Sequence, residues 1–476
     1  MSNIFDDYNK NTIKVNIDNT ILFIQNLCNS INGKIVSKYP TIDGLDIVFK
    51  KEYRHIKFST NPILDCEDSV QYQDSTYGFQ DSFKIESDYV LRVDNFVGEI
   101  SIKLSDFTAS GEFWEIETDT YKNTEGFFRA VLPLKDSAKP PHFYLSGQPM
   151  FLDKSFRASG YIDVKFGNNE IGFFDFNIGK QNYIIIESKN KVTYMAFDKI
   201  VESIIFSYAF ISGNLIRDEI ILLKFKDNDF CDIIDFKYKR IEDSVDSFFE
   251  LINPREYKLY LENTKRELSN LVYFPVSIFC ELVNLCNTNN PILRAVKIIT
   301  QSRNLSNEIK TASFFVALET IKQQIIQNQT TSVTPIKEKE QANELIIKIQ
   351  RVVNDIPDNL FNDKNIILRK IENLNTIGNN DSFELAFKIV QFNLTKDDKT
   401  FIKQRNRFLH GNIPFDNEEE NVKNKKIEEI MFQTHFLVCS LLLKYINYSG
   451  IVKDLLCYTQ LFKEKQLPEK PLFREI

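Results

Sequence analysis

The chain has 476 residues, which is too long for one compact hydrophobic core and predicts two or three domains. Hydrophobic residues make up 43% of it and charged residues 26%, a balance that argues against an overall disordered protein. The formal net charge of −7 is mild for this length and does not indicate a nucleic-acid binder. Any binding to nucleic acid must therefore come from a local basic patch.

The cysteines and the apolar runs of the sequence indicate in which cellular compartment the protein is expected. The seven cysteines are scattered, odd in number and without a CxxC pair, so we expect free thiols in a reducing compartment. The opening residues lack the basic and apolar regions of a signal peptide, and no apolar run is long enough to cross a bilayer. We expect a cytoplasmic protein with no membrane segment.

Up to about residue 240 the sequence is rich in short segments that alternate apolar and polar residues, which is typical of half-buried strands. This half is predicted to be mainly antiparallel β, as one domain or two, with a few helices. Turn residues between the strands predict hairpins. The predicted strands include 45–49, 89–93 and 161–166, the hairpin turns 167–169 and 188–191, and the helices 19–32 and 199–210.

From about residue 243 the apolar spacing becomes helical and glycine is nearly absent. Helices are predicted over 306–327, 337–356 and 422–445, with a polar break at 330–335 whose Pro335 suits a helix start. The fold class is therefore α+β. We expect a β-rich sensor or regulatory region over 1–240, a helical connector over 241–300 and an all-helical bundle over 301–476.

The most informative segment runs from Thr395 to Pro414 and is predicted to be one helix that ends at Gly411. On such a helix Asn406 and His410 are four residues apart and share a face. Arg405 is offset from His410 by roughly 140°, so both can serve one site if that face meets a second helix.

A cation, an amide and an imidazole together suit cleavage of RNA by its own 2′-hydroxyl. The reaction needs a base that works near neutral pH, and histidine is the natural candidate. It also needs positive charge on the phosphate, which a guanidinium supplies through two hydrogen bonds. Neither a metal nor another cofactor is required by this set of residues.

The string Arg405-Asn406-x-x-x-His410-Gly411 in a helical context resembles the Arg-x(4–6)-His motif of the HEPN superfamily, in the variant with Asn after Arg. The segment Ala317-Leu318-Glu319 is similar to one found in Apea-like HEPN proteins. The resemblance covers roughly residues 300–450. A β-rich region ahead of a C-terminal HEPN domain is also similar to the layout of Apea-like anti-phage proteins.

The resemblance implies a metal-independent endoribonuclease with a composite active site in a homodimer. It implies that Arg405 stabilises the transition state, that Asn406 positions groups, that His410 is the general base or acid, and that Glu319 holds Arg405 or His410 in place. Such proteins commonly act in abortive phage defence, cutting tRNA or other RNA once a sensor half responds to a trigger. A phage-derived molecule or a nucleotide is the expected trigger for the N-terminal half.

Basic residues beside the motif form a candidate RNA-binding track of Lys399, Lys403 and Arg407, although a run of this kind can also be a solvated helix face. A helical end that only carries charge, or a non-catalytic HEPN module for interaction and dimerisation, is the main alternative. The acidic residues 416–420 are expected in a loop that repels RNA or contacts the lysines after it.

A second enzymatic hypothesis is a metal-dependent nuclease. Asp175, Glu187 and Lys189 follow the Asp…Glu-x-Lys pattern, in which two carboxylates hold Mg²⁺ and the lysine assists the attacking water. Against it, Glu187 and Lys189 fall where a hairpin is expected to turn. His142 and His435 have no partners at metal-ligand spacing and are expected to be structural.

Overall fold

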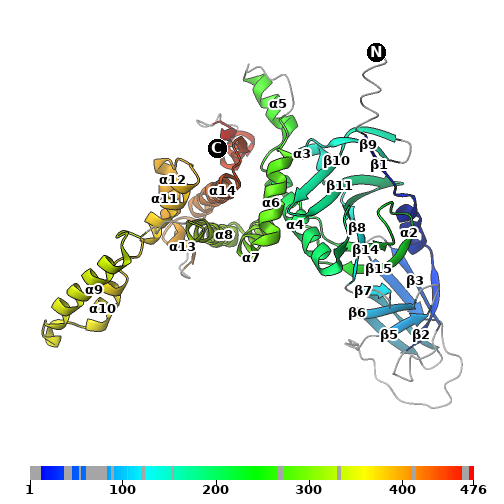
Figure 1. Ribbon diagram of the computed structural model, residues 1–476, viewed down its shortest axis with the longest axis horizontal. Helices are drawn as coiled ribbons and strands as arrows, with labels where there is room; N and C mark the ends of the chain where they lie inside the picture. The colour runs from blue at the N-terminus through cyan, green and yellow to red at the C-terminus, as the bar shows by residue number, and fades with distance from the viewer. Residues whose placement is uncertain are drawn as a thin grey trace. The chain divides into compact units, whose positions relative to one another are not determined.

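The computed structural model describes two compact units, Met1–Asn289 and Asn290–Ile476 (Figure 1). The boundary falls inside the expected connector 241–300, so its residues up to 289 belong to the N-terminal unit and its last eleven to the C-terminal unit. The predicted α+β class is confirmed. The described residues are 12–36, 46–52, 55–60, 83–86, 90–103, 106–118, 124–152, 155–264, 272–329, 334–409, 414–463 and 471–476.

The N-terminal unit is built on one large, mainly antiparallel sheet, as its alternating segments predicted. The predicted strand 161–166 lies in β10, and the described parts of the predicted strands 45–49 and 89–93 lie in β3 and β6. The strands are β1 (Ile13–Val15), β2 (Ile31–Val36), β3 (Asp46–Glu52), β4 (His55–Thr60), β5 (Phe83–Glu86), β6 (Val90–Lys103), β7 (Asp106–Thr118), β8 (Glu125–Leu134), β9 (Gln148–Leu152), β10 (Ser155–Phe166), β11 (Asn169–Ile178), β12 (Gln181–Ser188), β13 (Val192–Thr193), β14 (Glu219–Phe225) and β15 (Ile233–Arg240).

The strand order explains the shape of this sheet. Along it the order is β1-β9-β10-β11-β12-β8-β14-β15-β7-β4-β3-β2-β5-β6, and an additional pairing of β6 with β7 closes the last six strands into a ring. Because the ring is closed, none of these six strands has an unpaired edge to which another chain could add a strand. The open part of the sheet runs from β1 to β15 and contains Asp175 and Glu187.

Successive residues of a strand point to opposite faces of the sheet, so apolar side chains on both faces must be buried. Helices cover both faces of the open part. On one face the ring of Phe173 lies 5.6 Å from that of Tyr208 and 6.0 Å from that of Phe279, on α4 and α6. On the other face Phe23 of α2 packs edge-on against Phe236 at 5.0 Å. The helices of this unit are α2 (Asp18–Cys28), α3 (Pro141–Tyr144), α4 (Tyr194–Ser212), α5 (Pro254–Asn263) and α6 (Val276–Thr288).

Of the two predicted hairpins, one is confirmed and one is wrong. β10 and β11 pair across a tight turn in which Gly167 has a φ of 53°. The hairpin at 188–191 does not form, because β12 is already hydrogen-bonded to β11 on one edge and to β8 on the other. The next strand, β13, pairs with β8 instead, and Thr193 then caps α4 by accepting the Ala196 N–H.

A buried charged pair ties three strands of the sheet together. Arg129 of β8 has no exposed side-chain surface, and its Nη2 lies 2.6 Å from Oε2 of Glu187 on β12. The hydroxyl of Tyr161 on β10 donates to the other oxygen of Glu187 at 3.2 Å. Glycine is required at 172, because a Cβ there would lie 2.1 Å from that hydroxyl.

The C-terminal unit is mainly helical, and the predicted helices 306–327, 337–356 and 422–445 are confirmed as α8, α9 and α14. Pro335 precedes α9 by four residues and is not its first residue. The bundle is not purely helical, since a two-stranded sheet of β16 (Ile451–Lys453) and β17 (Phe473–Glu475) lies near its C-terminus. Among the described helices, none combines the length and the apolar character needed to cross a membrane.

The helical elements of this unit are α7 (Asn290–Gln301), η1 (Ser302–Asn304), α8 (Asn307–Gln327), α9 (Lys339–Asn354), η2 (Asp358–Leu360), α10 (Lys364–Glu372), α11 (Asn379–Ile389), α12 (Lys396–Lys403), α13 (Arg405–Leu409), α14 (Glu420–Tyr445) and α15 (Leu455–Lys463). Their core centres on α14, whose residues from Ile430 to Leu443 are all buried and which packs along α8.

Replacing Glu187 with alanine is expected to leave the Arg129 charge buried without its carboxylate. The free energy of unfolding of the N-terminal unit should fall by about 3–5 kcal/mol. The single tryptophan, Trp114 of β7, reports on this unit, so urea denaturation followed by its fluorescence measures the effect. Glu170→Ala, which removes an exposed carboxylate from β11, is the control and should change stability by no more than about 0.5 kcal/mol. Equal losses in the two variants would contradict the stabilising role of the buried pair.

Candidate functional site

The segment expected to form one helix from Thr395 to His410 forms two, so that prediction is wrong. Helix α12 ends at Lys403 and α13 begins at Arg405. Between them the backbone hydrogen bonds join residues three apart, as in a 3-10 turn. The Gln404 N–H donates to the Phe401 carbonyl, and the Arg407 N–H donates to the Gln404 carbonyl. His410 and Gly411 lie outside the described residues.

The start of this segment is capped by Thr395, as predicted. The Asp398 carboxylate that completes this cap also contacts other elements of the unit. The Thr395 hydroxyl accepts the Asp398 N–H at 3.1 Å, and the Asp398 carboxylate accepts the Thr395 N–H at 2.9 Å. Asp398 is fully buried, and its other oxygen accepts from the Gln433 amide of α14 at 2.6 Å. The Arg474 guanidinium of β17 lies 3.9 Å from the same carboxylate. This buried carboxylate therefore joins α12 to the centre of the bundle and to the C-terminal strand.

Arg405 is buried although it is the first residue of a short helix. Its side chain is 9% exposed, and its Nη1 lies 2.7 Å from Oε1 of Glu319 on α8. Its Nε and Nη2 donate to the side-chain oxygen of Asn406 at 3.3 and 2.8 Å. The structure thus brings Arg405, Asn406 and Glu319 together, three of the four residues singled out from the sequence for catalysis and its support.

Two further residues surround the guanidinium, and the sequence analysis did not identify them. Phe383 of α11 lies beneath Arg405 with its ring centre 5.7 Å from Cζ, and the Lys322 ammonium lies 4.4 Å from the same ring. Burial lowers the pKa of the Lys322 ammonium, and the charge of Arg405 adds to this effect against the attraction of Glu319. Lys322 could have been found, because it lies three residues after Glu319 and so on the same face of α8.

The three candidate RNA-binding residues lie in different surroundings. Lys399 pairs with Glu384 of α11 at 2.6 Å, but both side chains are more than 40% exposed, so the pair is weak. Lys403 is exposed, and Arg407 is exposed with its guanidinium 5.0 Å from the ring centre of Phe415. All three can therefore be reached from solvent.

The acidic turn after the motif is neutralised in part by the helix that follows it. Glu418 pairs with Lys426 of α14 at 2.6 Å. The Lys426 ammonium and the Arg407 guanidinium both lie against the ring of Phe415, at 5.5 and 5.0 Å from its centre. The loop was expected either to repel RNA or to contact the lysines after it, and the structure shows the second.

The residues of the metal-nuclease hypothesis are not brought together. Asp175 pairs with Ile184 and Glu187 with Gly172 in the β11–β12 register, so the two carboxylates point to opposite faces of the sheet. Lys189 is bound to Asp163 at 3.0 Å. The described residues contain no group of three His, Cys, Asp or Glu side chains placed to hold a metal ion. This register leaves Asp175 and Glu187 without a shared metal site.

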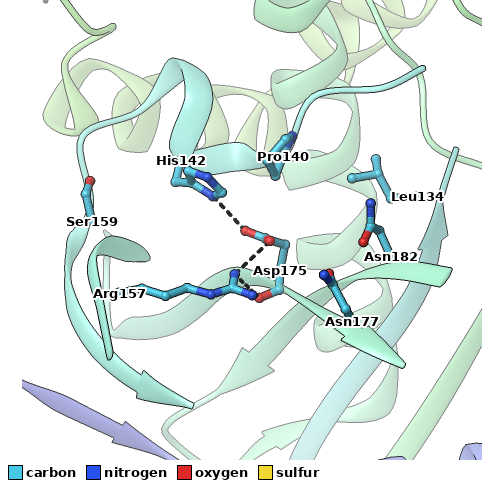
Figure 2. Close-up of a pocket in the computed structure, with 8 residues that line it drawn as sticks. All are labelled: Leu134, Pro140, His142, Arg157, Ser159, Asp175, Asn177 and Asn182. Atoms are coloured by element: carbon cyan, nitrogen blue, oxygen red, sulfur yellow. Dashed lines mark hydrogen bonds and ion pairs between the residues drawn. The ribbon is translucent and has the colours of Figure 1, made fainter. Parts of the chain in front are cut away.

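Asp175 instead takes part in a cluster that the sequence analysis missed. His142 Nδ1 lies 2.8 Å from one carboxylate oxygen of Asp175, and Arg157 Nη1 lies 2.8 Å from the other (Figure 2). Nothing in their spacing predicted this, because the three residues come from α3, β10 and β11. His435, by contrast, is buried in α14 with its ring 5.1 Å from that of Phe314, which fits the structural role expected for it.

Removing the Asp398 carboxylate is expected to loosen α12, the helix that precedes Arg405 in the chain. In Asp398→Ala the Thr395 N–H, the Gln433 amide and Arg474 lose an acceptor, which should cost about 2–4 kcal/mol of stability in the helical unit. Hydrogen exchange measured by mass spectrometry should show faster exchange across 396–409. Asp416→Ala removes an exposed carboxylate outside α12 and should leave that exchange nearly unchanged. Similar exchange in both variants would show that the Asp398 contacts do not hold this segment.

No protein-family model matches the chain, and neither a curated protein nor a solved structure matches it.

Proposed function

We propose that the C-terminal unit is a HEPN-type endoribonuclease whose site contains Arg405, Asn406 and His410. The observation that carries the proposal is the contact of Arg405 with Glu319, with 2.7 Å between Nη1 and Oε1. An arginine held by a carboxylate on a neighbouring helix has a defined position, and His410, the proposed base, follows it five residues later in the sequence. A positioned guanidinium beside a histidine is what attack by the RNA's own hydroxyl requires.

In the proposed reaction the 2′-hydroxyl oxygen attacks the adjacent phosphorus while its proton passes to the imidazole of His410. The bond from phosphorus to the 5′-oxygen breaks, and that oxygen takes up a proton. The products are a 2′,3′-cyclic phosphate and a 5′-hydroxyl end. No electrons are transferred, and water is not consumed in this step.

Arg405 would act on the charge that develops on the phosphate. Its Nε and Nη2 form the edge that now donates to the Asn406 oxygen, at 3.3 and 2.8 Å. We propose that a phosphate oxygen replaces Asn406 on this edge, while Glu319 keeps its hold on Nη1. Asn406 would then be released to position the phosphate or His410. Lys399, Lys403 and Arg407, all reachable from solvent, would bind phosphates along the strand.

A second copy of the chain is part of the proposal. On a helix Arg405 and His410 are offset by roughly 140° and cannot both face one phosphate from the same side. Two copies of α13 related by a two-fold axis would let the arginine of one chain and the histidine of the other meet at one site. Activity would then require a homodimer.

The biological role that fits this activity is a toxin-like effector in abortive phage defence, acting on tRNA or another cellular RNA. The N-terminal unit would be the sensor, responding to a phage-derived molecule or a nucleotide. The support for this role is the resemblance of the motif and of the domain order, together with the division of the chain into two compact units.

A non-catalytic interaction module is the second candidate, and one observation favours it. Arg405 already forms an ion pair with Glu319 and donates hydrogen bonds to Asn406 within the chain, an arrangement that also suits a structural arginine. In that case the helical unit would serve for dimerisation or as an adaptor. RNA cleavage by the whole chain separates the two candidates.

The first functional prediction concerns cleavage of RNA in EDTA by the full chain. His410→Ala and Arg405→Ala should each lower the rate by about 10²–10⁴-fold, because the base and the charge that stabilises the phosphate are lost. Lys388→Ala, in which a lysine of α11 is replaced, is the control and should cut at nearly the wild-type rate. If both site variants cut like the wild type, the assigned site is wrong; if no RNA is cut by any of them, even with phage lysate as the trigger, the interaction module is supported.

The second functional prediction concerns concentration. If the site is shared between two copies, the rate per chain should fall when the protein is diluted until the dimer dissociates, because a single chain lacks half of the site. Sedimentation at the same concentrations gives the dimer fraction. A rate per chain that stays constant while the dimer dissociates would contradict the shared site.

A further inference from the structure

A second candidate site lies in the N-terminal unit, at the end of the open part of the sheet (Figure 2). It is a cavity of about 480 Å³ between α3 and strands β8, β10, β11 and β12. This volume lies within the range of pockets that bind small molecules, roughly 300–1,000 Å³. Its polar lining consists of His142, Arg157, Ser159, Asp175, Asn177 and Asn182.

The sheet register explains why the amide side chains meet here. Asn177 on β11 lies directly opposite Asn182 on β12, and Asn182 lies opposite Leu134 on β8. Residues directly opposite in an antiparallel sheet point to the same face, so the three side chains form a row across the strand ends. Asp175 is two residues before Asn177 and therefore points to this face too.

A buried carboxylate orients the two nitrogen-rich side chains of the pocket. Asp175 is 8% exposed, and its two oxygens bind His142 Nδ1 and Arg157 Nη1 at 2.8 Å each. Arg157 Nη1 also donates to the Asp175 backbone carbonyl at 3.0 Å. Burial favours the neutral acid, but the hydrogen bond from His142 and the charge of Arg157 outweigh it and hold the pKa of the Asp175 carboxyl below its ordinary value. The carboxylate is therefore charged, and each of its oxygens already has a partner within the protein.

The atoms left facing the cavity include N–H groups of Arg157, one ring nitrogen of His142 and two side-chain amides, which can both donate and accept. With Nδ1 bound to Asp175, His142 keeps its Nε2 side for the pocket, and its side chain is 38% exposed. Arg157 is 28% exposed, and Nε and Nη2 have no partner among the described residues. The side-chain amides of Asn177 and Asn182 likewise have none among the residues that the structure describes. A register shift in β10 next to Arg157 turns this part of the strand, as bulges beside binding sites commonly do.

We propose that this pocket binds a small polar molecule through an oxyanion, a phosphate or a carboxylate. The oxyanion would take the Nε–Nη2 edge of Arg157, which matches two oxygens of such a group, together with His142. Asn177 and Asn182 would bind the polar part of the molecule, and Leu134 and Pro140 would line its apolar side. The site is built without any residue of the C-terminal unit, so the proposal does not depend on RNA cleavage.

Isothermal titration calorimetry of the full chain tests the proposal with three probes: inorganic phosphate, adenosine monophosphate and succinate. We expect at least one probe to bind, with Arg157→Ala and His142→Ala weakening it roughly 10-fold or more. Binding of phosphate or the nucleotide but not succinate would assign a phosphate ester, and the reverse result a carboxylate. Lys180→Ala is the matched control, since it removes an exposed cation from the turn between β11 and β12.

Loss of Arg157 also removes a partner of Asp175, so a second variant guards against misfolding. Asn182→Ala removes an amide without a protein partner among the described residues and should weaken binding several-fold, while Trp114 fluorescence and thermal unfolding stay at the wild-type values. The proposal is overturned if no probe binds at about 10 mM. It is equally overturned if Asn182→Ala and Arg157→Ala, both folded, bind like Lys180→Ala.

Discussion

In each unit of this chain a buried guanidinium is paired with a carboxylate on another element. In the N-terminal unit Arg129 is enclosed by the sheet and bound to Glu187. In the C-terminal unit Arg405 is held by Glu319, which connects α13 to the long helix α8. Removing one partner of such a pair typically costs about 3–5 kcal/mol, so each pair constrains how its elements pack.

The two pairs differ in what they leave accessible. Arg129 has no exposed side-chain surface, and its N–H groups are bound on several sides, so its role is structural. Arg405 keeps 9% of its side chain exposed, and among the described residues its Nε–Nη2 edge is occupied only by the neighbouring Asn406. That difference is why the proposed chemistry belongs to Arg405.

Strand register decides the function of the acidic residues in the sheet. Asp175 and Glu187 lie on neighbouring strands and look alike in the sequence, yet they point to opposite faces. Glu187 enters the core, where it neutralises Arg129, and Asp175 reaches the pocket, where it orients His142 and Arg157. A shift of register by one residue would exchange the faces of a whole strand, so sequence spacing could not separate the two carboxylates.

The sequence by itself determined what depends on near neighbours: the period of the strands and helices, the α+β class, the Thr395 cap and the candidate residues of the RNA-cleavage motif. Only the tertiary structure decided the break at Gln404, the partner of Arg405, the closure of β6 on β7 and the meeting of His142 with Asp175 and Arg157. These features join residues that are distant in sequence or depend on how helices pack. The period of a segment specifies which side is buried, but not which segment will cover it.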